Sequence, residues 1–161
     1  MKKLTYLLFL LLPVLFLTAP GCGESDDCGA EDILSLTEYI AAVGLTDSVE
    51  MDDSGLSYYI IDPGAPERPN ASSIVTVEYE GKLPSVTSEQ IFDATRPGQP
   101  VTFPLPNLIE GWQIGIPLIG AGGRIQLFVP ANLAYGPRSV GSICSNSDLV
   151  FEITLVEWTD Q

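Results

Sequence analysis

The chain has 161 residues, of which 45% are hydrophobic, so it is long enough for one compact domain with a real core plus an extension. Seven Lys and Arg stand against 21 Asp and Glu, a net charge of −14, which argues against nucleic acid as a partner. The absence of His excludes Ser-His-Asp and Cys-His mechanisms and removes the commonest metal ligand.

Residues 1–21 are typical of an export signal. Two lysines precede an apolar run from Leu4 to Leu17, which is too short to span a bilayer unaided. Small residues then precede Cys22, as in a bacterial lipoprotein signal, although Ala19 stands where such signals usually carry Leu. We therefore expect a lipid anchor on Cys22 that holds the protein at a membrane, facing the periplasm or the cell exterior. Ordinary signal cleavage, with Cys22 unmodified, is the alternative.

Removal of this signal makes the protein more acidic. Residues 1–21 contain two of the seven basic side chains and no acidic one, which leaves five against 21 and a net charge of −16. Such acidity argues against docking on anionic lipids, so membrane association would come from the anchor. In an oxidising compartment Cys28 and Cys144 could pair. The sequence leaves open whether their Cα atoms come close enough for a disulfide.

Residues 22–55 are predicted to form an acidic tether. The segment from Cys22 to Gly55 contains ten carboxylates and no Lys or Arg. Four apolar side chains within it lie at helical spacing, and Gly44 follows as a stop signal, so one short helix is predicted. The four are Leu36, Tyr39, Ile40 and Val43. About 12 residues are marginally stable as a helix alone, so we expect packing on its own domain and a monomer. Pairing with a second copy is the alternative.

Residues 56–161 are predicted to form the folded domain, with short β-rich segments separated by Pro and Gly. One short helix is predicted between two strands, with Leu108, Ile109, Trp112 and Ile116 on one face and Pro117 limiting its length. The pattern indicates an α+β fold, an antiparallel sheet of five to six strands curled around one short helix. The predicted strands are Leu56–Ile61, Ile74–Glu80, a segment near Ile91-Phe92, Pro100–Phe103, Arg124–Val129 and Leu149–Trp158.

The residues that remain for function are mainly aromatic. The glycines of residues 120–123 lead into a strand and lack the Lys of a phosphate-binding loop. Aromatic and aliphatic side chains around one or two polar groups predict a pocket that acts by shape. Five motifs carry this pattern: Val77-Glu78-Tyr79-Glu80-Gly81, Ile91-Phe92-Asp93-Ala94-Thr95, Leu108-Ile109-Glu110-Gly111-Trp112, Leu133-Ala134-Tyr135-Gly136 and Leu149-Val150-Phe151.

In this order the motifs resemble those of the FKBP-type peptidyl-prolyl cis-trans isomerases, over about residues 56–158. The resemblance implies that family's fold, an isomerase that acts on proline-containing polypeptides during folding of exported proteins, and macrolides as further ligands. It also implies that Asp93 is a buried carboxylate. Catalytic roles are implied for Tyr79, Asp93 and Tyr135, and substrate binding for Phe92, Phe103, Leu108, Ile109, Trp112, Ile143 and Phe151.

The expected mechanism needs no cofactor and no metal, because rotation about an X-Pro amide breaks only conjugation. One departure from the family pattern favours an alternative function. The family commonly shows Ile-Pro-Pro before the last strand, whereas this chain has Ile143-Cys144-Ser145, and the loop before it, residues 136–142, is one residue shorter. A binding module or chaperone with little turnover is therefore the second hypothesis, and a secreted β-rich domain without a proline pocket is the third.

Overall fold

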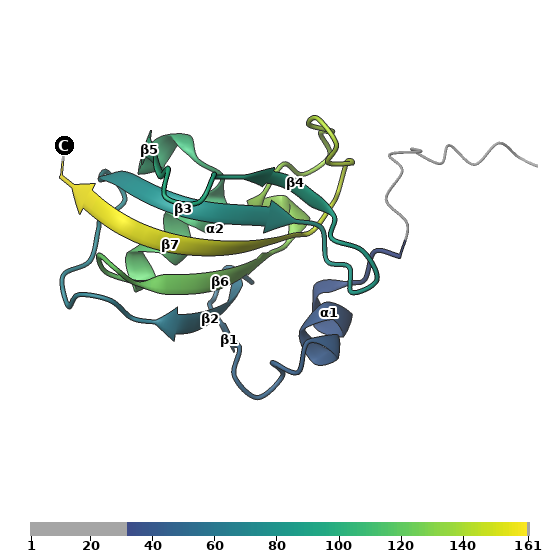
Figure 1. The fold of residues 1–161 in the computed structure, drawn as a ribbon. Coiled ribbons are helices and arrows are strands. Elements are labelled where there is room, and N and C mark those ends of the chain that lie inside the picture. Colours follow the sequence, from purple (N-terminus) through teal and green to yellow (C-terminus); the bar gives the residue numbers. More distant parts are fainter. Residues whose placement is uncertain (1–31, 161) are drawn as a thin grey trace, which may run out of the picture.

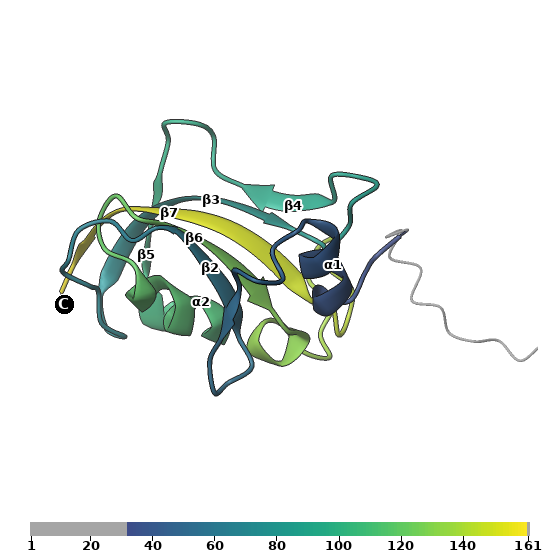
Figure 2. The same cartoon turned by 90° about the horizontal axis from the view of Figure 1, so that it is seen from below.

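The computed structural model describes residues 32–160 as a curved antiparallel sheet with a short helix on each face (Figures 1 and 2). The strands follow the order β1-β2-β6-β7-β3-β4, and β5 also pairs with β3. The predicted export signal, the lipidation site Cys22 and Cys28 lie outside the described residues. The strands are β1 (Glu50–Met51), β2 (Ser57–Asp62), β3 (Ile74–Lys82), β4 (Ile91–Ala94), β5 (Val101–Pro104), β6 (Arg124–Val129) and β7 (Leu149–Thr159).

The main core lies between the concave face of the sheet and helix α2 (Glu110–Gly115). Side chains alternate between the faces of a strand, so Val75 and Val77 of β3, like Ile153 and Leu155 of β7, are fully buried on this side. Full burial of each such side chain contributes roughly 1.5–3 kcal/mol. The predicted α+β class, a sheet curled around a short helix, is confirmed.

Helix α2 is short because of its sequence. Pro117 has no backbone N–H to continue the helix, and the chain passes into a 3₁₀ turn at Ile116–Leu118. Gly115 lets the helix lie directly on β6, since a Cβ there would come within 2.6 Å of the Leu127 side chain. This close contact fixes the height of α2 above the sheet.

The convex face carries a second, smaller core under helix α1 (Leu36–Ala42). Ser35 and Glu38 form a capping box at its start, and Gly44 follows its end with a φ of 75°. Tyr39 is 3% exposed and packs against Phe128, with ring centroids 6.3 Å apart. The helix packs on its own domain, as predicted, and it has seven residues because both ends are capped.

One feature differs from the predicted elements. The sheet has seven strands, because the two exposed residues of β1 pair with β2. A strand so short has no alternation from which it could be predicted.

Cys144 is disulfide-bonded, and both other cysteines of the chain fall outside the described residues. None of the described helices is long and apolar enough to cross a membrane.

Candidate functional site

An aromatic pocket of about 290 Å³ opens on the concave side, between α2, strands β3 to β5 and the loop after β6. We call it the aromatic pocket. Nine of the ten side chains predicted for the site line it, and Asn107 completes it. The lining residues are Tyr79, Phe92, Asp93, Phe103, Asn107, Leu108, Ile109, Trp112, Tyr135 and Phe151.

Trp112 is central to the packing of the pocket. It lies on the first turn of α2, is 4% exposed, and makes edge-to-face contacts with Tyr79 and Phe151 at centroid distances of 5.1 and 5.3 Å. Phe103 adds a third edge contact at 6.5 Å. Mutual edge-to-face packing holds each ring in one orientation. The cavity is therefore formed before any ligand binds.

The opposite wall depends on a residue with no side chain. Phe92 of β4 and Phe151 of β7 meet edge to face at 5.6 Å, directly over Gly81 of β3. A Cβ at position 81 would lie 2.7 Å from both rings, which is closer than real contacts allow. Gly81 is therefore required for the shape of the pocket. Sequence reasoning placed it in a motif but gave it no role.

The polar edge of the pocket is a hydrogen bond between Tyr79 and Asp93. The Tyr79 hydroxyl donates to Asp93 Oδ2 at 2.5 Å. Burial, then this hydrogen bond and the charge of Asp93, raise the pKa of Tyr79 far above its ordinary value, so the phenol stays protonated. Asp93 itself is exposed, contrary to the buried carboxylate expected from the resemblance. The reason is that β4 is the edge strand of the sheet, so no further strand covers it.

Two lining residues, Tyr135 and Ile109, carry donors that have no acceptor in the described part of the chain. Burial, and secondarily the charge of Asp93, raise the pKa of the Tyr135 hydroxyl, which has no acceptor among residues 32–160. The Ile109 N–H precedes α2 and likewise donates no backbone hydrogen bond within the described part of the chain. Tyr135 is positioned by the turn before it, where Ala131 N–H donates to the Asp148 carboxylate at 2.9 Å. Both groups are therefore available to an incoming carbonyl oxygen.

Ile143 lies beside the aromatic pocket rather than in it. It is 5% exposed and lines an adjoining hollow of about 200 Å³, together with Phe92, Asp93 and Tyr135. A small hairpin, closed by hydrogen bonds between Val140 and Ile143, forms its far wall. Asn107, which sequence reasoning missed, joins the lining because the 3₁₀ turn Leu105–Asn107 ends two residues before the pocket residue Ile109. No motif marks it.

The lining suits binding by shape better than bond-breaking chemistry. It offers an aromatic interior in which the buried Trp112 indole N–H has no described acceptor, a neutral phenol hydrogen-bonded to a carboxylate, and the two donors of Tyr135 and Ile109. None of the ten lining residues is a Ser, Thr, Cys, Lys or His, and the carboxylate of Asp93 is hydrogen-bonded to Tyr79. Such a cavity can hold a compact apolar ring and bind a carbonyl next to it.

Comparison with known proteins identifies the family. The family model described as FKBP-type peptidyl-prolyl cis-trans isomerase matches residues 65–156, more than half of the chain. The isomerase FkpA of Aeromonas hydrophila is 39% identical over 134 residues, which cover 83% of this chain and 49% of that protein. The "Outer membrane protein MIP" of Legionella longbeachae is 48% identical over 105 residues, covering 64% of this chain and 44% of that protein.

Solved structures agree with the family match. The crystal structure of FkpA from Escherichia coli superposes with a TM-score of 0.69 at 34% identity, covering 78% of this chain and 58% of that one. The present chain spans about half the length of the curated relatives that it matches. The similarity therefore concerns the domain that contains the aromatic pocket.

Proposed function

The chain belongs to the FKBP-type peptidyl-prolyl cis-trans isomerase family, and on this basis we propose that its aromatic pocket catalyses rotation about X-Pro bonds of exported polypeptides. The observation that carries the proposal is the preformed ring-lined cavity, with two free donors beside it. Its physiological effect would be to shorten a folding step that otherwise takes tens of seconds.

The mechanism follows from the amide and the cavity. The X-Pro bond rotates over a barrier of roughly 18–20 kcal/mol because resonance keeps it planar. In the twisted transition state the nitrogen lone pair is localised and the amide is less dipolar. An apolar cavity that strips water therefore disfavours the planar amide more than the twisted one. No proton has to be transferred.

The pocket residues take three roles in this proposal. The prolyl ring would be enclosed by aromatic and aliphatic side chains, and Ile143 would extend this wall toward the neighbouring residue of the substrate. The enclosing residues are Trp112, Phe92, Phe103, Phe151 and Leu108. The Tyr135 hydroxyl and the Ile109 N–H bind the substrate carbonyls. Tyr79 and Asp93, joined by their hydrogen bond, fix the rim and place a negative charge beside the rotating amide.

A protease-coupled assay on a short Ala-Leu-Pro-Phe peptide tests this activity. We expect catalysis by the wild-type chain, and a loss of roughly tenfold or more in kcat/KM for Phe92→Ala and Asp93→Ala. Val156→Ala is the matched control, because this exposed residue of β7 lies outside the pocket. Isomerisation at the uncatalysed rate with the wild-type chain would refute the proposal and leave a binding module as the function.

Macrolide binding is a second, independent measure of the same pocket. A ligand that fills it should change the fluorescence of Trp112, with Trp158→Phe removing the only other tryptophan. A saturable change that Phe92→Ala weakens supports a proline-sized pocket. No change at high ligand concentration would argue against one.

We also propose that the protein is an exported lipoprotein, with residues 1–21 as the signal, residues 22–55 as an acidic segment whose α1 and β1 pack on the domain, and residues 56–161 as the isomerase domain. The apolar run before Cys22 supports this, and one relative is named as an outer membrane protein. Labelling with a fatty-acid analogue should modify the wild-type chain and not Cys22→Ala. Equal labelling of the two, or none, would refute acylation at Cys22. Mass spectrometry of a non-reduced digest would show whether Cys144 is joined to Cys28.

A further inference from the structure

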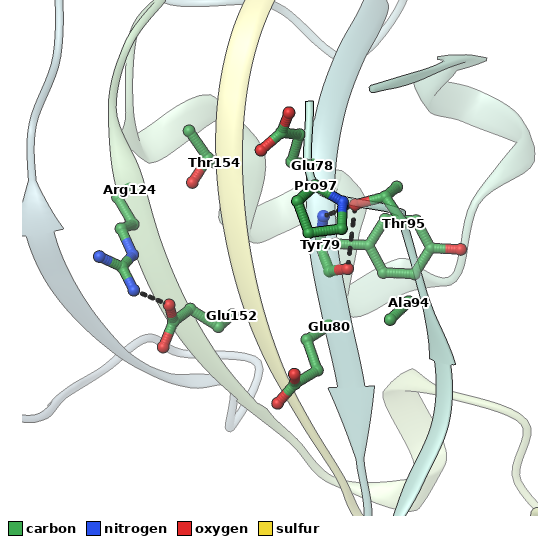
Figure 3. Close-up of a pocket in the computed structure, with 9 residues that line it drawn as sticks. All are labelled: Glu78, Tyr79, Glu80, Ala94, Thr95, Pro97, Arg124, Glu152 and Thr154. Atoms are coloured by element: carbon green, nitrogen blue, oxygen red, sulfur yellow. Dashed lines mark hydrogen bonds and ion pairs between the residues drawn. The ribbon is translucent and has the colours of Figure 1, made fainter. Parts of the chain in front are cut away.

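A second hollow, of about 430 Å³, lies on the convex face of the sheet, behind β3 as seen from the aromatic pocket (Figure 3). We call it the convex groove. Its volume is within the range of about 300–1,000 Å³ that is typical of ligand sites. Its lining includes Glu78 and Glu80 of β3, Arg124 of β6, Glu152 and Thr154 of β7, and Pro97 in the loop after β4.

The floor of the groove holds an unfavourable pair of like charges. In the register of β3 and β7, Glu80 stands directly opposite Glu152, and like charges in this position are destabilising. Arg124 pairs with Glu152 and Lys82 pairs with Glu80 at 3.9 Å, so two cations face the three carboxylates of the groove. A third carboxylate, Glu78, accepts a backbone hydrogen bond from Gly98 at 3.1 Å. A further cation in the groove would relieve the repulsion.

The groove and the aromatic pocket are two sides of one edge of the sheet. Tyr79 contributes to both, and Ala94 and Thr95 in the groove directly follow Phe92 and Asp93 in the pocket. Only β4, an edge strand of four residues, borders the sheet there. An extended polypeptide that passes around this edge can therefore contact both hollows.

We propose that the convex groove is an exosite for a Lys- or Arg-bearing stretch of client polypeptide, whose X-Pro bond lies in the aromatic pocket. The inference rests on the proposed isomerase function. Carboxylates of Glu78 and Glu80 would bind the cationic side chains, the Thr154 hydroxyl would bind backbone, and Pro97 would pack against aliphatic stems. The site would retain a client between successive rotations and favour cationic chains over neutral ones.

The negative charge of the groove favours a cationic client over two other occupants, the acidic segment of this chain and a second copy of the chain. The chain's own segment from Cys22 to Gly55 carries ten carboxylates and no basic residue, so the groove repels it. A second copy of the chain, at a net charge of −14, is disfavoured for the same reason. A cationic segment of another polypeptide is attracted both by the groove and by the protein as a whole.

Binding is tested with a fluorescein-labelled, proline-free peptide such as Gly-Lys-Thr-Lys-Ser-Arg, followed by anisotropy on the full chain. Glu78→Gln/Glu80→Gln should weaken binding roughly three- to tenfold, because each exposed charge pair contributes little and is screened by salt. The matched control is Glu67→Gln/Glu89→Gln, which removes the same charge from exposed positions outside the groove. An equal loss in both double variants, or no binding by the wild-type chain, would overturn the exosite.

Catalysis separates the exosite from the pocket. With a long unfolded chain carrying lysines near its prolines, the groove variant should lose about the same factor in kcat/KM, whereas the tetrapeptide rate stays unchanged. Equal rates of the groove variant and the control on the long chain would contradict retention. A wild-type chain that accelerates neither substrate would refute the isomerase activity instead, and the peptide affinity would still decide the exosite.

Discussion

On the concave side of β3, Tyr79 and Gly81 face the aromatic pocket, whereas Glu78 and Glu80 of the same strand line the convex groove. The concave residues touch rings at fixed distances, and a single added carbon at Gly81 would collide with two of them. The convex residues are partly exposed and make few constrained contacts. Substitutions of the β3 residues at the aromatic pocket should therefore change its shape and the stability of the protein. Substitutions of Glu78 and Glu80 should change mainly the charge of the groove.

The largest effect on stability is expected where the convex face is covered. Tyr39→Ala would remove the buried ring that α1 packs against Phe128, and we expect a loss of roughly 3 kcal/mol in the free energy of unfolding. Tetrapeptide activity of the folded protein should stay unchanged, because α1 lies across the sheet from the pocket. Urea unfolding measures the free energy of unfolding, and the protease-coupled peptide assay measures the isomerase activity. Thr37→Ala, on the exposed side of α1, is the control and should cost little.

Gly81→Ala should affect both stability and activity. Overpacking typically costs about 1–3 kcal/mol, and here the strain displaces Phe92 and Phe151, so kcat/KM should fall by roughly 30-fold or more. Gly123→Ala is the matched control, because a Cβ there would lie 2.8 Å from the Gly120 carbonyl oxygen, outside both α2 and the pocket lining. It should lose similar stability and keep most activity. Similar activity losses in the two variants would show that general destabilisation, and not pocket shape, causes them.

The contrast between the faces also explains how far sequence reasoning reached. Strand β6 was predicted at Arg124–Val129 and forms there, because apolar alternation and flanking glycines are local signals. The aromatic pocket was predicted from ordered motifs. The exposure of Asp93, the contact over Gly81 and the opposition of Glu80 to Glu152 depend on strand register between segments far apart in the chain. No local pattern specifies that register.

Tyr79→Phe should have an intermediate effect, since it removes only the hydrogen bond to Asp93. We expect kcat/KM to fall roughly three- to tenfold, which corresponds to the range of about 0.5–1.5 kcal/mol for a typical net hydrogen bond, because Asp93 is exposed and water can replace the lost donor. The pKa of Tyr79 is raised in the folded state, so the unfolded chain loses this proton first, near pH 10.

The pH dependence of stability follows with a definite sign. The stabilisation from the protonated Tyr79 is fully present below about pH 10 and is lost as the pH rises further, because the folded state then binds more protons. In urea unfolding, the free energy of unfolding should fall less between pH 8 and pH 11 for Tyr79→Phe than for the wild type. Tyr58 and Tyr135, whose pKa values are also raised, would account for the remaining slope. Identical losses in both proteins would mean that Tyr79 is not protected from ionisation.

The smallest effect is expected on the convex face, and it has the opposite sign. Glu80→Gln removes one of the two like charges that stand opposite each other on β3 and β7, so the free energy of unfolding should rise by about 0.2–1 kcal/mol. The gain should shrink at high salt, where the repulsion is screened. Glu67→Gln is the control, because it removes the same charge from an exposed loop position and therefore shows the effect of a lower net negative charge alone. A destabilised Glu80→Gln protein would mean that the contact with Lys82 outweighs the repulsion from Glu152, and the groove would then have no deficit of positive charge for a ligand to fill.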